Sequence, residues 1–153
     1  MQQEHVAVWM SFPSPKIPSP KEFYERYKND PEAAMRTAFK IGQERGEDIA
    51  RSLGIQGNDL ETLAAVLNEF QRRSQGDPSE KVEGNRVTMH CWTGFCPIMR
   101  AALTLGIPWV WLDTNFAWPQ IRGIASYVIP TIKFKMSSAK SRGDPACIFI
   151  FEE

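Results

Sequence analysis

The residues best suited to chemistry gather in one short stretch, where His90, Cys91 and Cys96 lie within seven residues, and a third cysteine, Cys147, follows near the end of the chain. Together these side chains would suffice for a tetrahedral zinc site of three cysteines and one histidine. However, His90 and Cys91 are neighbours on a predicted strand, where successive side chains point to opposite faces. Cys147 also has no second cysteine at the spacing typical of structural zinc sites. We therefore expect no zinc site through His90/Cys91/Cys96/Cys147 and no other cofactor.

Cys96 is the candidate nucleophile because it precedes Pro97, and proline is typical of the first position of a helix. At the N-cap, unpaired backbone N–H groups and the helix dipole favour a thiolate, which lowers the cysteine pKa below its usual ~8.5. His90 is the histidine near enough in the sequence to act as its base or acid. Asp113 or Asp144 would orient that histidine or hydrogen-bond a substrate. The predicted catalytic residues are Cys96, Asp113 and His90. The alternative is that Cys96 is a small buried thiol that packs like a hydrophobic residue.

Aromatic residues surround the same region of the sequence, with four of the five tryptophans between positions 92 and 118. Such a density is usual in a core, but it also suits the wall of a small-molecule pocket. Asp113 lies within this apolar stretch, where an unpaired carboxylate is costly to bury. We predict the following substrate-binding residues: Trp92, Trp109, Trp111, Asn115, Trp118, Arg122, Asp144 and Cys147.

The second half of the chain carries a run of basic residues without an acidic one. Between Thr114 and Arg142 these are Arg122, Lys133, Lys135, Lys140 and Arg142. One interpretation is a solvated basic face of a sheet. The other is a site for a small anion, and it favours a substrate that carries a carboxylate.

Helix signals dominate the first half of the chain. Asp30 followed by Pro31 is typical of an N-cap and the first helical position, and predicts a helix over residues 31–53. Within it, Gly42 and Gly46 would let a second element approach closely. A capping box formed by Asn58 and Glu61 predicts another helix that ends near residue 73.

The pattern then changes to alternating apolar residues. Two strands are predicted around a turn at residues 83–85, and two more on either side of the turn at 142–145. Between them, a helix is predicted from Pro97 to Gly106. Residues 109–118 suit either a strand or a helix, and the spacing of Asp113, Phe116 and Ala117 favours a helix. The fold class we expect is α+β, with N-terminal helices followed by an antiparallel sheet of two hairpins and helices inserted between the hairpins.

The chain length of 153 residues is consistent with one domain. Residues 13–20 contain four prolines and cannot donate a regular hydrogen-bond ladder. We therefore expect a proline-rich N-terminal arm over residues 1–29, and a single α+β small-molecule-binding domain over residues 30–153.

Composition argues against several classes of protein. The 18 Lys and Arg residues balance 18 Asp and Glu residues, so the chain has no net attraction to nucleic acid or to an anionic membrane. No apolar run approaches the ~20 residues of a membrane span, and the N-terminus lacks the pattern of a signal peptide. An odd cysteine count without framework spacing is typical of reduced thiols. We expect a soluble cytoplasmic protein.

Several of these residues also resemble a known family. Cys96-Pro97, the run ALTLGIPW, Asp113 and the segment RGDPACIFIFEE resemble the L-2-amino-thiazoline-4-carboxylic acid hydrolase-like family over roughly residues 55–153. The last segment is also similar to the C-terminal signature of 4-vinyl reductase domains. The resemblance implies an antiparallel sheet, a small-molecule pocket, and roles for Cys96, Asp113, Asp144 and Cys147. Val110 departs from the hydrolase-like pattern, which has a cysteine there.

For that hydrolase, the resemblance implies opening of a thiazoline ring that carries a carboxylate. Our leading hypothesis is accordingly an enzyme that acts on a small anionic heterocyclic or amide-like compound. The alternatives are a non-catalytic ligand-binding or sensory module, and a structural subunit of a homodimer whose proline-rich arm embraces a partner.

Overall fold

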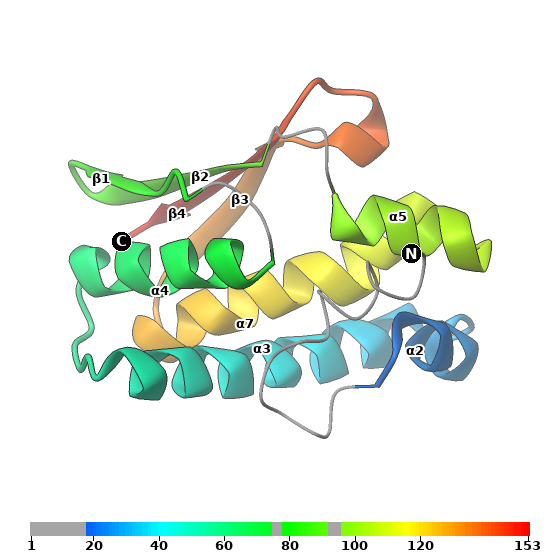
Figure 1. The fold of residues 1–153 in the computed structure, drawn as a ribbon, viewed down its shortest axis with the longest axis horizontal. Helices are drawn as coiled ribbons and strands as arrows, with labels where there is room; N and C mark the ends of the chain where they lie inside the picture. Colours follow the sequence, from blue (N-terminus) through cyan, green and yellow to red (C-terminus); the bar gives the residue numbers. More distant parts are fainter. Residues whose placement is uncertain (1–17, 75–77, 92–95) are drawn as a thin grey trace.

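The computed structural model describes residues 18–74, 78–91 and 96–153, and it combines helices with a four-stranded antiparallel sheet (Figure 1). The helical elements are α2 (Pro20–Tyr27), α3 (Pro31–Leu53), α4 (Leu60–Arg73), α5 (Pro97–Leu105), α6 (Trp109–Leu112), the π-helical turn η1 (Asp113–Ala117), α7 (Trp118–Val128) and the 3-10 turn η2 (Lys140–Arg142). The strands are β1 (Lys81–Glu83), β2 (Arg86–Cys91), β3 (Lys133–Ser138) and β4 (Cys147–Glu152). The predicted α+β class, with helices first and further helices between two hairpins, is confirmed.

The sheet has the strand order β1-β2-β4-β3, so the last strand of the chain lies between β2 and β3. In the β2–β4 register, Val87 pairs with Phe151, Met89 with Phe149, and Cys91 with Cys147. Because side chains directly opposite each other project from the same face, these pairs build one apolar surface. Val87 and Met89 are fully buried.

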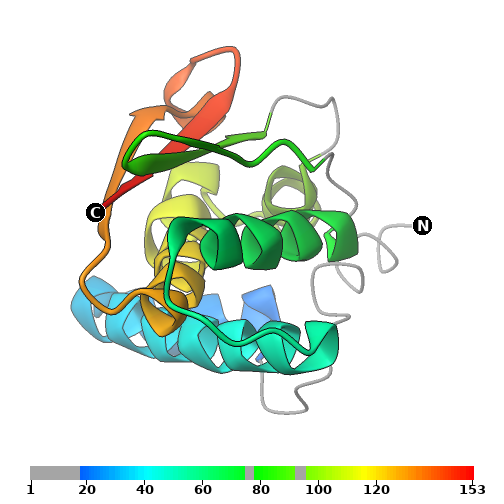
Figure 2. The ribbon, with the colours of Figure 1, turned by 90° about the vertical axis from the view of Figure 1, so that its left-hand side faces the viewer.

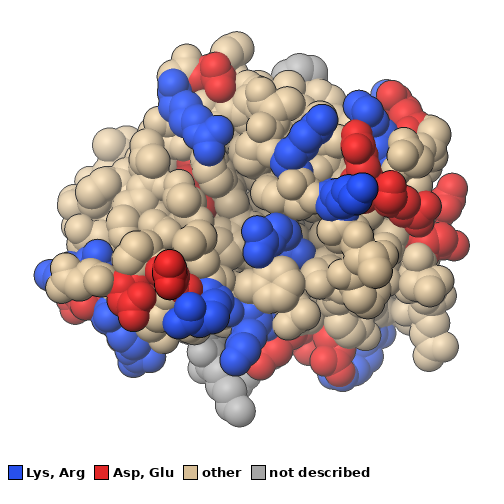
Figure 3. All heavy atoms as spheres, turned by 180° about the vertical axis from the view of Figure 1, so that it is seen from behind, with Lys and Arg blue, Asp and Glu red and all other residues tan. Residues whose placement is uncertain are grey.

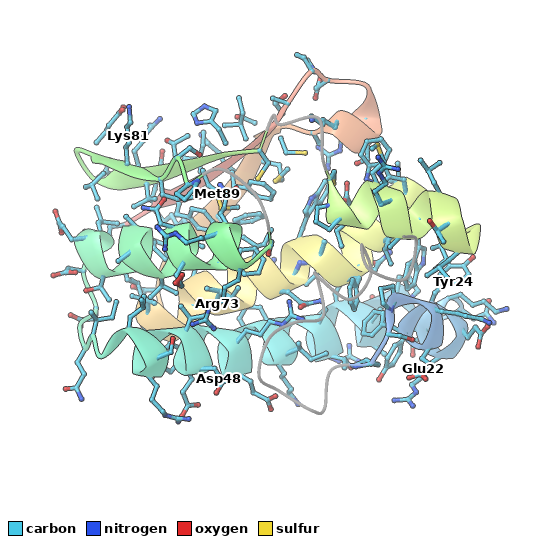
Figure 4. The ribbon with its side chains drawn as sticks, viewed as in Figure 1. Glu22, Tyr24, Asp48, Arg73, Lys81 and Met89 are labelled. Carbon is cyan, nitrogen blue, oxygen red and sulfur yellow. The ribbon has the colours of Figure 1, made fainter. Side chains whose placement is uncertain are left out.

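The helices α3, α4 and α7 lie on one side of the sheet, in two layers (Figures 1 and 2). The nearer layer contains α4, which contacts β1 and β2, together with α7. The farther layer is α3, which packs along α7. Met89 projects from β2 towards the helices (Figure 4), and the core fills the space between the sheet and α7.

Polar caps and prolines set where the first helices begin. The Asp30 side chain accepts a hydrogen bond from Ala33 N at 3.2 Å, and Pro31 is the first residue of α3, as predicted. The predicted cap of α4 is wrong by one residue. Asp59, and not Asn58, accepts the bond from Thr62 N at 2.8 Å. An N-cap side chain accepts a hydrogen bond from the backbone N–H two or three residues further along the chain, and Thr62 lies three residues after Asp59.

The region expected to form an N-terminal arm contains the helix α2. Ser19 caps it by accepting a hydrogen bond from Glu22 N at 3.2 Å. Phe23 is fully buried, and its ring lies 4.8 Å from that of Phe116. This part of the predicted arm is therefore packed into the domain, whereas positions 1–17 lie outside the described residues.

The predicted helical character of residues 109–118 is confirmed, but the helix is interrupted by the π-helical turn. Pro119 follows that turn within α7. Its ring has no N–H to donate and crowds the carbonyl four residues earlier, which favours a wider turn at this point. Asp113 is the first residue of the turn.

Acidic and basic side chains are interspersed on the face of the molecule in Figure 3, in keeping with the balanced composition. No helix within the described residues combines the length and apolar character needed to cross a membrane.

Candidate functional site

A cavity of about 90 Å³ lies between α4, the ends of β2 and β4, the start of α5, and α7. That space would hold several water molecules or one small organic molecule. Its apolar wall includes Met89, Trp118 and Phe149. Its polar lining consists of Gln71, Ser74, Asp113, Lys140 and the three cysteines, Cys91, Cys96 and Cys147.

Cys96 occupies the N-cap of α5, as predicted. Its Sγ accepts a hydrogen bond from Met99 N at 3.5 Å, and Pro97 is the first residue of the helix. The expected lowering of its pKa is wrong. Burial raises the pKa of Cys96 to about 11, and the nearby Asp113 carboxylate raises it further, while the Met99 N–H only partly offsets them. The sulfur therefore carries a proton at neutral pH.

Cys91 and Cys147 contribute the other two thiols, from the neighbouring strands β2 and β4. Cys91 Sγ lies 3.7 Å from Gln71 Oε1, and Cys147 Sγ accepts a hydrogen bond from Lys140 N at 3.3 Å. Burial raises the pKa of both thiols. All three described cysteines are free.

Asp113 is the acid of the cavity. It is only 4 % exposed, and burial raises its pKa to about 6, although the Ser141 hydroxyl and the Arg142 guanidinium lower it. Arg142 also lies over the ring of Trp118, 5.0 Å from its centroid. A carboxyl group with a pKa this close to neutrality is suited to exchange protons with a bound molecule.

A second buried carboxyl group, that of Glu80, does not line the cavity but is hydrogen-bonded to the lining residue Gln71. Glu80 Oε1 accepts a hydrogen bond of 2.5 Å from Gln71 Nε2, and the same amide nitrogen lies 3.1 Å from the backbone oxygen of His90. Ser79 Oγ also donates to that oxygen at 3.0 Å. Burial raises the pKa of Glu80, and the Gln71 amide partly offsets this effect. Gln71 thus joins Glu80 to the Cys91 thiol.

The structure brings only some of the predicted site residues together. Cys96, Asp113, Trp118 and Cys147 line the cavity. His90 does not, because Met89 and Cys91 on either side of it face inward and adjacent side chains on a strand point to opposite faces. Instead, the charge of His90 lowers the pKa of Glu80.

The remaining predicted binding residues have other contacts. Trp111 packs edge-on against Tyr24 of α2, with ring centroids 4.8 Å apart, and Arg122 lies over Phe39. Asn115 donates a hydrogen bond to Trp111 O at 3.1 Å, within its own helical segment. Asp144 accepts one from Ala139 N at 2.9 Å and so shapes the turn before β4. Trp109 packs against the core away from the lining, and Trp92 lies outside the described residues.

Gln71 and Ser74 are cavity residues that the sequence analysis did not select. Both continue the apolar stripe of α4, since Gln71 lies four residues after Leu67 and Ser74 four after Phe70. A polar residue in phase with an apolar helix face is the signal that could have identified them. Val110, where the hydrolase-like pattern has a cysteine, is 49 % exposed and does not line the cavity.

Among the described residues, the structure contains no group of three or more His, Cys, Asp or Glu side chains arranged to hold a metal ion. In comparisons with known proteins, the chain matches no family model, no curated protein and no solved structure.

Proposed function

We propose that this protein binds a small molecule in the cavity and hydrolyses it, with Asp113 as the general base. The observation that carries the proposal is the convergence of Asp113, Lys140 and Ser74 on one largely apolar hollow. Enclosed apolar pockets with a few polar groups and a perturbed carboxyl pKa are typical of sites that bind and transform small molecules.

The cavity lining offers two kinds of polar contact. Lys140 supplies a positive charge that suits a carboxylate on the ligand. Ser74 Oγ is buried, lines the cavity, and has no hydrogen-bond partner among the described residues. Because an unsatisfied buried hydroxyl is costly, a polar ligand atom bonded to Ser74 would remove that cost.

The proposed reaction is hydrolytic opening of an anionic heterocycle at a ring C–N bond, and the resemblance to the thiazoline hydrolase-like family supports such a ring opening. Asp113 takes a proton from a water molecule, and the water oxygen bonds to the electrophilic carbon. The C–N bond then breaks, and the departing nitrogen receives the proton. Cys96 keeps its proton in the resting state because its pKa is about 11, so we do not assign it a standing thiolate.

The proposal is tested with 2-amino-thiazoline-4-carboxylate and the purified protein, by measuring formation of a product heavier by one water molecule. Asp113→Asn is expected to abolish turnover while the compound still raises the melting temperature of the variant. Cys96→Ser is the matched variant at another lining residue and is expected to keep turnover. Loss of turnover in Cys96→Ser alone would assign the reaction to the thiol instead.

The raised pKa of all three thiols favours a second candidate, a non-catalytic ligand-binding or sensory module like the 4-vinyl reductase domains that the C-terminal segment resembles. In that case the compound raises the melting temperature of the wild-type protein, but its mass never changes.

A further inference from the structure

Cys91 and Cys147 lie directly opposite each other where β2 and β4 run side by side (Figure 1). Directly opposed residues of an antiparallel pair have Cα atoms about 4.5 to 5.5 Å apart. Disulfide-bonded cysteines have Cα atoms about 4.4 to 6.8 Å apart. The backbone therefore already holds these two cysteines at a separation that a disulfide can bridge.

The two side chains also point the same way. Both line the cavity, and they continue the row of inward-facing pairs that Val87 and Met89 form with β4. After burial, the neighbouring Cys147 is the largest influence that raises the pKa of Cys91, which is the effect of a thiol close by. Both the strand register and the direction of the side chains therefore place the two sulfur atoms close together.

We propose that Cys91 and Cys147 are a redox-modification site, which closes to a disulfide between β2 and β4 by exchange with a low-molecular-weight disulfide such as oxidised glutathione. The Cys147 thiolate attacks one sulfur of the oxidant and releases one reduced glutathione. The Cys91 thiolate then attacks the Cys147 sulfur of the mixed disulfide and releases a second reduced glutathione. Each cysteine loses its proton to solvent or to the departing thiolate, so the protein loses two electrons and two protons.

We assign the first attack to Cys147, although burial raises the pKa of both thiols. At Cys147 burial is the largest influence, and Asp113 and Asp144 add to it, but the backbone N–H and the ammonium charge of Lys140 both lower the pKa. Lys140 lowers the pKa of Cys91 as well, but burial, Cys147, Glu80 and Cys96 all raise it. In the second step, the mixed disulfide on Cys147 is attacked by Cys91, which lies opposite it on β2.

Cys96 has a different position from the pair. It belongs to the N-cap of α5 and not to the sheet, and its sulfur accepts the hydrogen bond from Met99 N. Closure of the disulfide therefore leaves Cys96 as the remaining thiol of the three on the cavity lining. Disulfide formation also removes the thiol hydrogen of Cys91, whose sulfur lies 3.7 Å from Gln71 Oε1.

The test is to incubate the folded, full-length protein with oxidised glutathione, quench with acid, alkylate the remaining thiols under denaturing conditions, and map the peptides without reduction. We expect the number of free thiols to fall from three to one, the protein mass to fall by two hydrogen atoms, and one cross-linked pair of peptides to contain Cys91 and Cys147. A link that involves Cys96, or a stable glutathione adduct with no internal link, would overturn the proposal.

Three variants provide the controls. Cys96→Ser keeps the strand pair and is expected to form the same link as the wild type, whereas Cys91→Ser and Cys147→Ser are expected to form none. If either serine variant fails to fold, as judged by circular dichroism, the wild-type peptide map still decides the question.

The link should also change the stability of the protein, because it constrains the unfolded chain between two distant positions. We expect the oxidised protein to melt several degrees higher than the reduced protein, and dithiothreitol to reverse the increase. An unchanged or lower melting temperature in a fully linked sample would show that the link strains the sheet and would contradict the inferred geometry. None of these measurements requires a substrate, so their outcome is separate from that of the proposed hydrolysis.

Discussion

Gly42 of α3 and Gly123 of α7 lie against each other where the two helices pack, and a Cβ atom on Gly123 would come within 3.0 Å of the Gly42 Cα. The same added atom would lie 2.1 Å from the backbone oxygen of Phe39. Close approach at Gly42 is therefore confirmed, and the missing side chains let the buried α7 lie directly on α3. The helix that carries the cavity residues Trp118 and Ile121 is positioned by this contact.

Gly42→Ala is expected to lower the free energy of unfolding by about 3 kcal/mol or more, because a Cβ atom there would lie 2.0 Å from the backbone oxygen of Gln120. A backbone atom cannot move aside as the tip of a flexible side chain can. Chemical denaturation measures the change. Glu44→Ala, at an exposed position of the same helix, is the control and should differ from wild type by less than about 0.5 kcal/mol. Equal stabilities of the two variants would refute the close contact.

Phe23→Ala tests whether α2 belongs to the folded domain. Phe23 is fully buried, with its ring 4.8 Å from the rings of Phe116 and Tyr27, so the substitution should cost about 3–5 kcal/mol of unfolding free energy. Thermal and urea denaturation would report it. The exposed neighbour Glu25, changed to alanine, should have almost no effect. A mild phenotype for Phe23→Ala would mean that α2 is not part of the cooperative unit.

Gln71→Leu is expected to destabilise the protein by about 1–3 kcal/mol, because it removes the 2.5 Å hydrogen bond that a buried carboxyl oxygen of Glu80 accepts. The loss should be larger at pH 8 than at pH 5, since the charged form of Glu80 depends most on the amide. Arg72→Ala is the matched control, because Arg72 forms an exposed ion pair with Glu69 at 3.0 Å and such pairs contribute little. Comparable losses in the two variants would exclude a structural role for the Gln71–Glu80 bond.

Asp113 makes the stability of the protein depend on pH. Its pKa in the folded state is about 6, above the ordinary aspartate value of 3.8, so the folded protein binds more protons than the unfolded chain between these values. Stability from this group is therefore fully present below about pH 4 and is lost as the pH rises to about 6. Two pKa units correspond to roughly 3 kcal/mol, an upper bound for the effect.

Asp113→Asn removes this titration. Urea denaturation at pH 4, 5, 6 and 7.5 is expected to show a smaller loss of stability with rising pH in the variant than in the wild type. Glu80, whose pKa is also raised, titrates in both proteins and so cancels in the comparison. Parallel pH profiles would show that Asp113 does not titrate in this range.

The fold could be predicted from the sequence where a local signal has a local cause. Asp30-Pro31 and Cys96-Pro97 begin helices because a capping side chain and a proline suit the first turn regardless of what packs around it. The same signal, Ser19-Pro20, begins α2. It was masked by the prolines before it, which favoured an extended arm.

The chemistry of the site could not be predicted in the same way, because it depends on burial. The position of Cys96 at a helix N-terminus was predicted correctly, but the pKa of its thiol is set mainly by the apolar surroundings that the distant segments α4, α7 and β4 supply. For the same reason, an alternating strand pattern could indicate that Cys91 faces the core, but not that Cys147 would be its partner. That pairing follows from the strand order.

The strand order also determines when each strand can pair during synthesis of the protein. The central strand β4 is the last of the four to leave the ribosome, yet β2 and β3 both pair with it. Until it emerges, β3 has no neighbour among the described strands and both of its edges are unpaired, while β2 is paired with β1 on one edge only. The β1–β2 hairpin and β3 therefore cannot join into one sheet until β4 has been synthesised.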